Sequence, residues 1–145
     1  MNPKPINDLT HELIGAAIEV HRELGPGLLE STYEGAYAQE LTLRNISHRR
    51  QIAMPVSYKS SLMEIGYRLD IVADGRVVVE LKAVEKLLPI HSVQVLTYLR
   101  LGHYPLGLLI NFNVRKLTDG VERVSNNAPS LSAPSVVSAF QNSSP

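Results

Sequence analysis

The stretch Y-R-L-D-I-V-A-D-G-R-V-V-V-E-L-K-A-V, residues Tyr67–Val84, consists of two strand-like halves on either side of a glycine turn. Apolar side chains occupy every second position in each half, and the side chains of a strand point alternately to its two faces. The remaining positions include Asp70 in the first half, and Glu80 and Lys82 in the second. The stretch therefore predicts a β-hairpin with one wholly apolar face and one face that carries charges.

The length of the hairpin loop decides whether those charges meet. A two-residue loop, Asp74-Gly75, would pair Leu69 with Glu80 and bring a charge onto the apolar face. A three-residue loop, Ala73–Gly75 with its glycine in the left-handed conformation, keeps the apolar residues on one face and gathers the charges on the other. Because burial of an apolar face fixes strand register strongly, the sequence favours the three-residue loop.

In this register Asp70 pairs with Val78, so Asp70 and Glu80 are diagonal neighbours, roughly 7–8 Å apart at the backbone. Two carboxylates at that spacing can bind one hard cation through their oxygens. Lys82, one pleat further along, could orient or deprotonate a water molecule, or stabilise charge on a phosphoryl group. These are the parts that metal-assisted phosphodiester hydrolysis requires. An E-x-K triplet by itself, in contrast, is equally typical of a solvated hairpin face.

Two helical segments on either side of the hairpin supply further polar residues. Glu30 and Tyr33, in G-L-L-E-S-T-Y, are three residues apart and share one helix face. Gln94 and Tyr98, in Q-V-L-T-Y, are four residues apart, and His91 lies on the same stripe. The second helix is therefore expected to present an amide, a phenol and an imidazole together, although a structural role is favoured for His91.

Each of these residues also has a structural interpretation. Glu30 suits the first turn of a helix, where a negative charge interacts favourably with the helix dipole. A capping box, Ser31-x-x-Glu34, would instead leave Glu30 just outside the helix. Tyr33 and Tyr98 fit core positions with satisfied hydroxyl groups. The residues alone leave these alternatives open.

The rest of the sequence predicts a small α/β domain. Apolar periodicity and turn residues indicate a helix over 8–24 that ends at Gly25-Pro26-Gly27, a second helix from 29 to near 45, and strands over 52–58 and 61–65. The hairpin strands over 67–72 and 77–84 follow, and then a helix over 89–101 and a buried strand over 106–112. We expect a single domain over residues 1–124 and a disordered tail rich in Ser, Asn and Pro over residues 125–145.

Composition limits the classes of function. The chain has 145 residues, enough for one core, and its Lys plus Arg and its Asp plus Glu both number 14, so no overall positive charge indicates nucleic acid. The absence of cysteine excludes disulfides, iron–sulfur clusters and Cys-type zinc sites. With no signal-peptide pattern and no apolar run of membrane-spanning length, we expect a cytoplasmic protein with no membrane partner. The basic residues either border a phosphate groove or are solvated surface: His48-Arg49-Arg50, Lys59, Lys86 and Arg100.

Taken together and in this order, the G-x-x-E-x-x-Y stretch, the D…E-x-K hairpin and the Q-x-x-x-Y helix resemble the GxxExxY protein family, which is placed in the PD-(D/E)xK nuclease-like superfamily. The resemblance runs from about Ile6 to Val124 and includes V-E-L-K-A-V-E-K-L and L-G-L-L-I-N-F-N-V. It implies an α-β-β-β-α-β core with a central mixed sheet flanked by helices, in agreement with the predicted element order. One departure is Leu69, which stands where the superfamily's nominal proline precedes the aspartate.

The resemblance also implies roles for individual residues. The implied catalytic residues are Asp70, Glu80, Lys82 and Glu30. The three acids among them are the implied ligands of Mg²⁺ or Mn²⁺, with Glu30 acting directly or through water. Gln94 and Tyr98 match the Q-x-x-x-Y element near site and substrate, and Tyr33 joins them as a substrate-positioning residue.

The leading hypothesis is therefore a metal-dependent nuclease that hydrolyses phosphodiester bonds in DNA or RNA. The alternative is a non-catalytic nucleic-acid or protein interaction module on a nuclease fold. A weaker third hypothesis is a metal-dependent hydrolase of small nucleotides, which the neutral charge would suit. The expected partner is nucleic acid. A homodimer is a further possibility, because a substrate that must be contacted from two sides often requires a dimeric protein.

Overall fold

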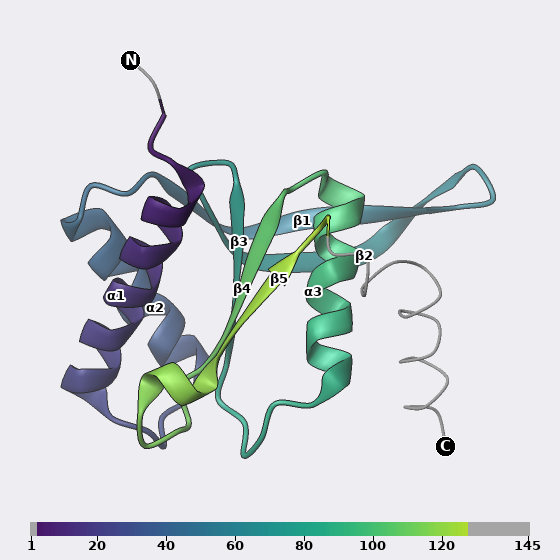
Figure 1. Ribbon diagram of the computed structural model, residues 1–145. Helices are drawn as coiled ribbons and strands as arrows, with labels where there is room; N and C mark the ends of the chain where they lie inside the picture. Colours follow the sequence, from purple (N-terminus) through teal and green to yellow (C-terminus); the bar gives the residue numbers. More distant parts are fainter. Residues whose placement is uncertain (1–2, 128–145) are drawn as a thin grey trace.

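The computed structural model describes residues 3–127, in which three helices and a sheet form an α/β domain. The elements are α1 (Ile6–Leu24), α2 (Glu30–Leu43), β1 (His48–Tyr58), β2 (Ser61–Ala73), β3 (Val77–Lys82), α3 (Pro89–Gly102), β4 (Leu106–Asn111), the 3₁₀ turn η1 (Leu117–Gly120) and β5 (Val121–Ser125). Figure 1 shows the sheet between the α1–α2 pair and α3. The predicted α/β class, with helices flanking a central sheet, is confirmed.

The five strands lie in the order β1-β2-β3-β4-β5. The β3–β4 pair is parallel and is connected through α3, whereas the other pairs are antiparallel, so the sheet is mixed as predicted. The sequence did not indicate β5. This edge strand reads V-E-R-V-S and buries only Val124, so its apolar signal is too weak for prediction.

The two faces of the sheet bury two separate apolar cores. Ile71, Val79 and Phe112 pack with α1 and α2, whereas Val78 packs with α3. Both faces of β3 and β4 are therefore covered, which is why their sequences are almost continuously apolar. The expectation that all odd-numbered hairpin residues share one face is wrong for Leu69, which packs in the α3 core.

The β2–β3 loop has the predicted length but starts one residue later. Ala73 pairs with Val77, so the loop is Asp74–Arg76, with its glycine at a φ of 66°. Every predicted pair moves by two residues, and Asp70 comes to lie opposite Glu80 instead of diagonal to it. Because a shift of two residues leaves each side chain on the same face, the burial pattern does not distinguish the two registers.

The first two strands form a long hairpin arm that leaves the sheet. The segments predicted as separate strands over 61–65 and 67–72 are one continuous β2. β2 pairs with β3 only through Ile71–Ala73, and Figure 1 shows the rest of the β1–β2 hairpin extending away from the other strands. Gly66 is required within this arm, because a Cβ there would lie 2.2 Å from the carbonyl oxygen of Met54, beside a bulge in β1.

The last strand, β5, ends at Ser125, next to the predicted domain boundary at residue 124. Ser125 pairs with Leu106, and the Asn126 side chain donates a hydrogen bond to the carbonyl of Tyr104. The predicted disordered tail falls mainly on residues 128–145, which lie outside the described residues. No helix in the described part of the chain is long and apolar enough to cross a membrane.

Asn111 joins the C-terminal ends of β3 and β4. It pairs with Lys82 across the parallel strands and is almost fully buried. Its amide donates a hydrogen bond to the carbonyl of Val84, and its oxygen accepts bonds from the N–H groups of Val84 and Asn113. The residue thereby fixes the chain immediately after Lys82.

We expect Asn111→Ala to lower the free energy of unfolding by about 2–3 kcal/mol, because the Val84 N–H and carbonyl both lose their hydrogen bonds to the buried Asn111 amide. Asn113→Ala is the matched control: it keeps the backbone bond to Asn111 and should stay within about 0.5 kcal/mol of the wild type. Urea unfolding measures both, and equal values for the two variants would contradict the assignment.

Candidate active site

Asp70 and Glu80 bind each other's strand at the point where β2 separates from β3. The Asp70 N–H donates to Oε1 of Glu80 at 3.0 Å, and the Leu81 N–H donates to Oδ2 of Asp70 at 2.9 Å. The last residue pair of the β2–β3 ladder is Ile71–Val79. The two carboxylates thus take the place of the next backbone bonds, which holds them side by side in the opening between the strands.

Burial makes this arrangement costly while both groups are charged. Glu80 is 5% exposed, and burial, with the charge of Asp70 as the second cause, raises its pKa to about 8. Burial likewise raises the pKa of Asp70, although the hydrogen bond from Leu81 opposes the rise. A buried and a half-buried carboxyl group held side by side ionise together readily only if positive charge compensates them.

Lys82 and Glu30 complete an electrostatic cluster around this pair. Burial raises the pKa of Glu30, Asp70 and Glu80, and the positive charge of Lys82, at the end of β3, opposes this rise. Glu30 is the first residue of α2 and partly exposed; burial raises its pKa, and the charges of Asp70 and Glu34 add to the rise. The structure therefore brings the four predicted catalytic residues to one end of the β2–β3 pairing.

Tyr33 lies behind the site, not in it. Its ring is fully buried and stacks on Phe112, with ring centroids 4.6 Å apart. Its hydroxyl donates to the carbonyl of Gly25 at 2.6 Å and accepts a bond from the Leu28 N–H. Tyr33 can therefore influence substrate only indirectly, by holding the loop that leads into Glu30.

The α3 residues differ in how close they lie to the carboxylates. Tyr98 is half-buried, packs against Tyr67 of β2 and has its pKa raised to about 12, by burial first and by the charge of Glu80 second. His91 accepts a hydrogen bond at Nδ1 from the Leu88 N–H, which fits the structural role favoured from the sequence. Burial and the charge of Lys82 lower its pKa. Gln94 lies one helical turn before Tyr98 and is partly buried.

The sequence profile of the PD-(D/E)XK nuclease superfamily matches residues 7–124, most of the chain. The chain belongs to this superfamily. No curated protein and no solved structure shows significant similarity to it. The matched residues include nearly all of the three helices and five strands and all the candidate site residues. The electrostatic cluster therefore lies within the superfamily domain.

Members of the PD-(D/E)XK nuclease superfamily generally use divalent metal ions, and the donor set suits one. The cluster contains two cations, Lys82 and the Arg50 that pairs with Glu34. When all its groups are ionised its net charge is −2, because it also contains four carboxylates: Glu30, Glu34, Asp70 and Glu80. Buried carboxylate oxygens are the ligands that hard divalent cations prefer. Among the described residues, however, no three His, Cys, Asp or Glu side chains form a group that could hold an ion. Glu30 is part of the electrostatic cluster, whereas the hydrogen bonds link only Asp70 and Glu80.

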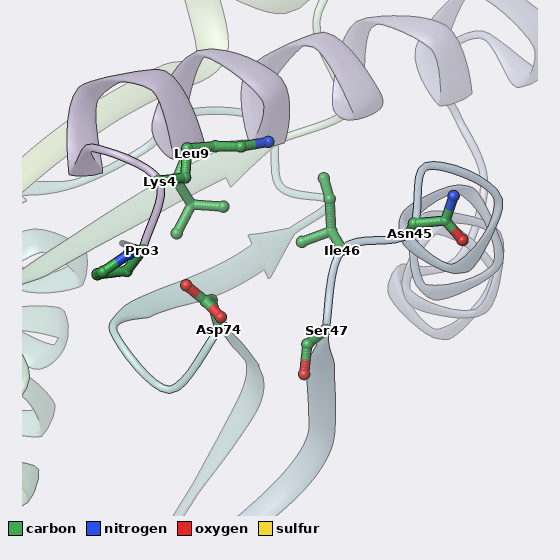
Figure 2. Close-up of a pocket in the computed structure, with 7 residues that line it drawn as sticks. All are labelled: Pro3, Lys4, Leu9, Asn45, Ile46, Ser47 and Asp74. Atoms are coloured by element: carbon green, nitrogen blue, oxygen red, sulfur yellow. The ribbon is translucent and has the colours of Figure 1, made fainter. Parts of the chain in front are cut away.

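A separate pocket of about 240 Å³ lies at the other end of the β2–β3 pairing. Figure 2 shows it between the start of α1, the segment that joins α2 to β1, and Asp74 in the β2–β3 loop. It contains none of the predicted site residues of the superfamily domain. The lining residues are Pro3, Lys4, Leu9, Asn45, Ile46, Ser47 and Asp74.

Sequence reasoning missed two residues that contact the site. Glu34 is buried; it accepts bonds from Arg50 and from the Gln51 amide, and does not form the capping box considered for it. Its position four residues after Glu30, on the same helix face, was an available signal. Gln51 bonds Glu34 and lies opposite Asp70 across the β1–β2 pair, and nothing in its sequence context indicates this.

The raised pKa of Glu80 predicts a pH dependence of stability in metal-free protein. A carboxyl whose pKa is higher when folded binds its proton more tightly in the folded state. The stability is then largest below the ordinary pKa of 4.5 and decreases as the pH rises towards 8. We expect the free energy of unfolding to fall by on the order of 2 kcal/mol between pH 5 and pH 9.

Glu80→Gln should remove much of this decrease, because the amide oxygen still accepts the Asp70 N–H but carries no charge. Glu85→Gln, at an exposed position, is the matched control and should retain the wild-type slope. Chemical unfolding in the presence of a chelator measures all three proteins. A wild-type stability that rises over this range, or an unchanged slope in Glu80→Gln, would refute the assignment.

Proposed function

We propose that the protein is a divalent-metal-dependent nuclease that hydrolyses phosphodiester bonds of DNA or RNA. The observation that carries this proposal is the Asp70–Glu80 pair, a half-buried and a buried carboxylate that accept hydrogen bonds from each other's strands with Lys82 close by. Membership of the PD-(D/E)XK nuclease superfamily supports a nuclease-type function in general. The order of the motifs supports the narrower assignment to the GxxExxY protein family.

In this proposal Asp70 and Glu80 hold Mg²⁺ or Mn²⁺, and Glu30 supports the ion from the start of α2. A divalent ion bound there supplies Lewis acidity towards phosphoryl oxygens and makes a coordinated water more acidic. The chain's own contribution is a site in which buried carboxylates destabilise each other until positive charge arrives. Because the carboxylates repel each other when both are ionised, a bound divalent ion is more favourable than an empty site with both groups charged.

Lys82 is the cation whose charge acts on both carboxylates. It can bind a phosphoryl oxygen, or orient the attacking water and assist its deprotonation. Tyr98 and Gln94 contribute polar groups from α3. With its pKa raised to about 12, the Tyr98 hydroxyl stays protonated at neutral pH and can donate a hydrogen bond to substrate. Tyr33 contributes by holding the loop before Glu30.

The decisive experiment is a cleavage panel of single- and double-stranded DNA and RNA, with Mg²⁺ and with Mn²⁺. We expect metal-dependent cleavage by the wild type, and a loss of at least about 100-fold in Asp70→Asn and in Lys82→Ala. Lys86→Ala removes an exposed lysine four residues further on and is the matched control, which should retain activity.

Calorimetry with Mg²⁺ separates the two roles. Binding should be lost in Asp70→Asn but retained in Lys82→Ala, because Lys82 is not a ligand. Cleavage that is unchanged in both variants would overturn the site. Nucleic-acid binding without cleavage in any arm would replace the nuclease by an interaction module, and cleavage confined to free nucleotides would replace it by a small-nucleotide hydrolase. A homodimer and a cytoplasmic location stay predictions.

A further inference from the structure

Gln51 has an unusual backbone at the position opposite Asp70. β1 and β2 pair on both sides of it, Arg50 with Ile71 and Ile52 with Leu69, but Gln51 and Asp70 are themselves unpaired. The φ of Gln51 is 50°, in the left-handed region, which strains a residue that has a side chain. β1 therefore carries a local distortion directly beside the candidate active site.

Other positive-φ residues in the molecule have ordinary explanations. Among the described residues, the non-glycine examples besides Gln51 lie in turns or at a helix end: Asn45, Lys59, Ser60, Asp74 and His103. Gln51 is the one that lies inside a strand with residue pairs on both sides. A strained conformation in such a place persists only when surrounding contacts hold it, and such contacts concentrate at functional sites.

The side chain of Gln51 is held by one of the acidic groups near the site. Its Nε2 donates to Oε1 of Glu34 at 2.7 Å. Gln51 also lies opposite Asp70 in the β1–β2 register, and its side chain acts to lower the pKa of Asp70, against the larger rise that burial causes. Because an ionised carboxylate can only accept and a primary amide has two N–H groups, Gln51 can donate one N–H to Glu34 and the other to Asp70. Glu34 is in turn held by Arg50, whose Nε and guanidinium NH2 lie 3.3 and 3.1 Å from Oε2.

We propose that Gln51 is a positioning residue that orients the carboxylate of Asp70, and that Glu34 holds Gln51 for this task. Glu34 fixes the amide from α2, the amide fixes Asp70 from β1, and Asp70 then receives the Leu81 N–H from β3. The distortion of β1 turns the Gln51 side chain to where it reaches both carboxylates. As far as metal binding is concerned, this inference rests on the proposed function.

Gln51→Gly tests the inference, because glycine adopts the left-handed conformation freely but has no amide side chain. We expect the Tm to stay within roughly 3 °C of the wild type or to rise. In metal-free protein, hydrogen exchange of the Leu81 amide should nevertheless become about tenfold faster relative to other β3 amides, because its acceptor Asp70 is no longer held. The dissociation constant for Mg²⁺ should increase roughly 10–100-fold, as is usual when a residue that orients a ligand is lost.

Lys59→Gly is the matched control. It relieves a left-handed residue at the tip of the same hairpin and should leave Leu81 exchange and Mg²⁺ binding unchanged. If Gln51→Gly fails to fold, Gln51→Asn takes its place, because asparagine tolerates this backbone but is one methylene too short to bridge both carboxylates. Unchanged Leu81 exchange in the folded variant would overturn the proposal. Absence of Mg²⁺ binding by the wild type would overturn the proposed function, whereas the exchange measurement still decides the role of Gln51.

Discussion

The hydrogen bonds that Asp70 and Glu80 make to each other's strands are the constraint on which the rest of this site depends. They occur where the β2–β3 ladder stops, so two side chains satisfy backbone groups that a further residue pair would have satisfied. Because the side-chain oxygens accept these backbone N–H groups, β2 can leave the sheet and continue into the arm without leaving the N–H groups unsatisfied. The arrangement also keeps both carboxylates inside the opening. The same two hydrogen bonds therefore allow the strands to separate and bring the two carboxylates together.

The charges around the site make the ionised form of its carboxyl groups less favourable in the folded protein than in water. Lys82 offsets part of the repulsion among Asp70, Glu80 and Glu30, while Glu34 adds to the negative charge and is itself paired with Arg50. A domain selected for stability alone would bury apolar side chains at these positions. The apolar cores on both faces of the sheet, together with the buried Asn111, supply the rigidity that keeps such an arrangement folded. Local departures from favourable structure of this kind are typical of functional sites.

Local patterns predicted most of the elements. The helix that ends at Gly25, the helix that begins at Pro89 and the three-residue hairpin loop follow from periodicity and turn chemistry, which depend on neighbours in sequence. The register of the hairpin was off by two residues, because both registers place every side chain on the same face. β5 was missed because an exposed edge strand carries little apolar signal. Leu69 was assigned to the wrong core because β2 departs from the sheet there, and no local pattern records that departure.

The sequence by itself determined the α/β class, the resemblance to a nuclease family and the candidate residues Asp70, Glu80, Lys82 and Glu30, since residue type, order and spacing carry that information. Only the tertiary structure decided that Asp70 and Glu80 face each other directly, and that Tyr33 lies behind the site. It also decided that Glu34 on α2 holds Gln51 on β1, and that Gln51 lies opposite Asp70. The physical reason is that these contacts join segments far apart in the chain. Their geometry depends on how strands separate and helices pack, which no spacing within one segment encodes.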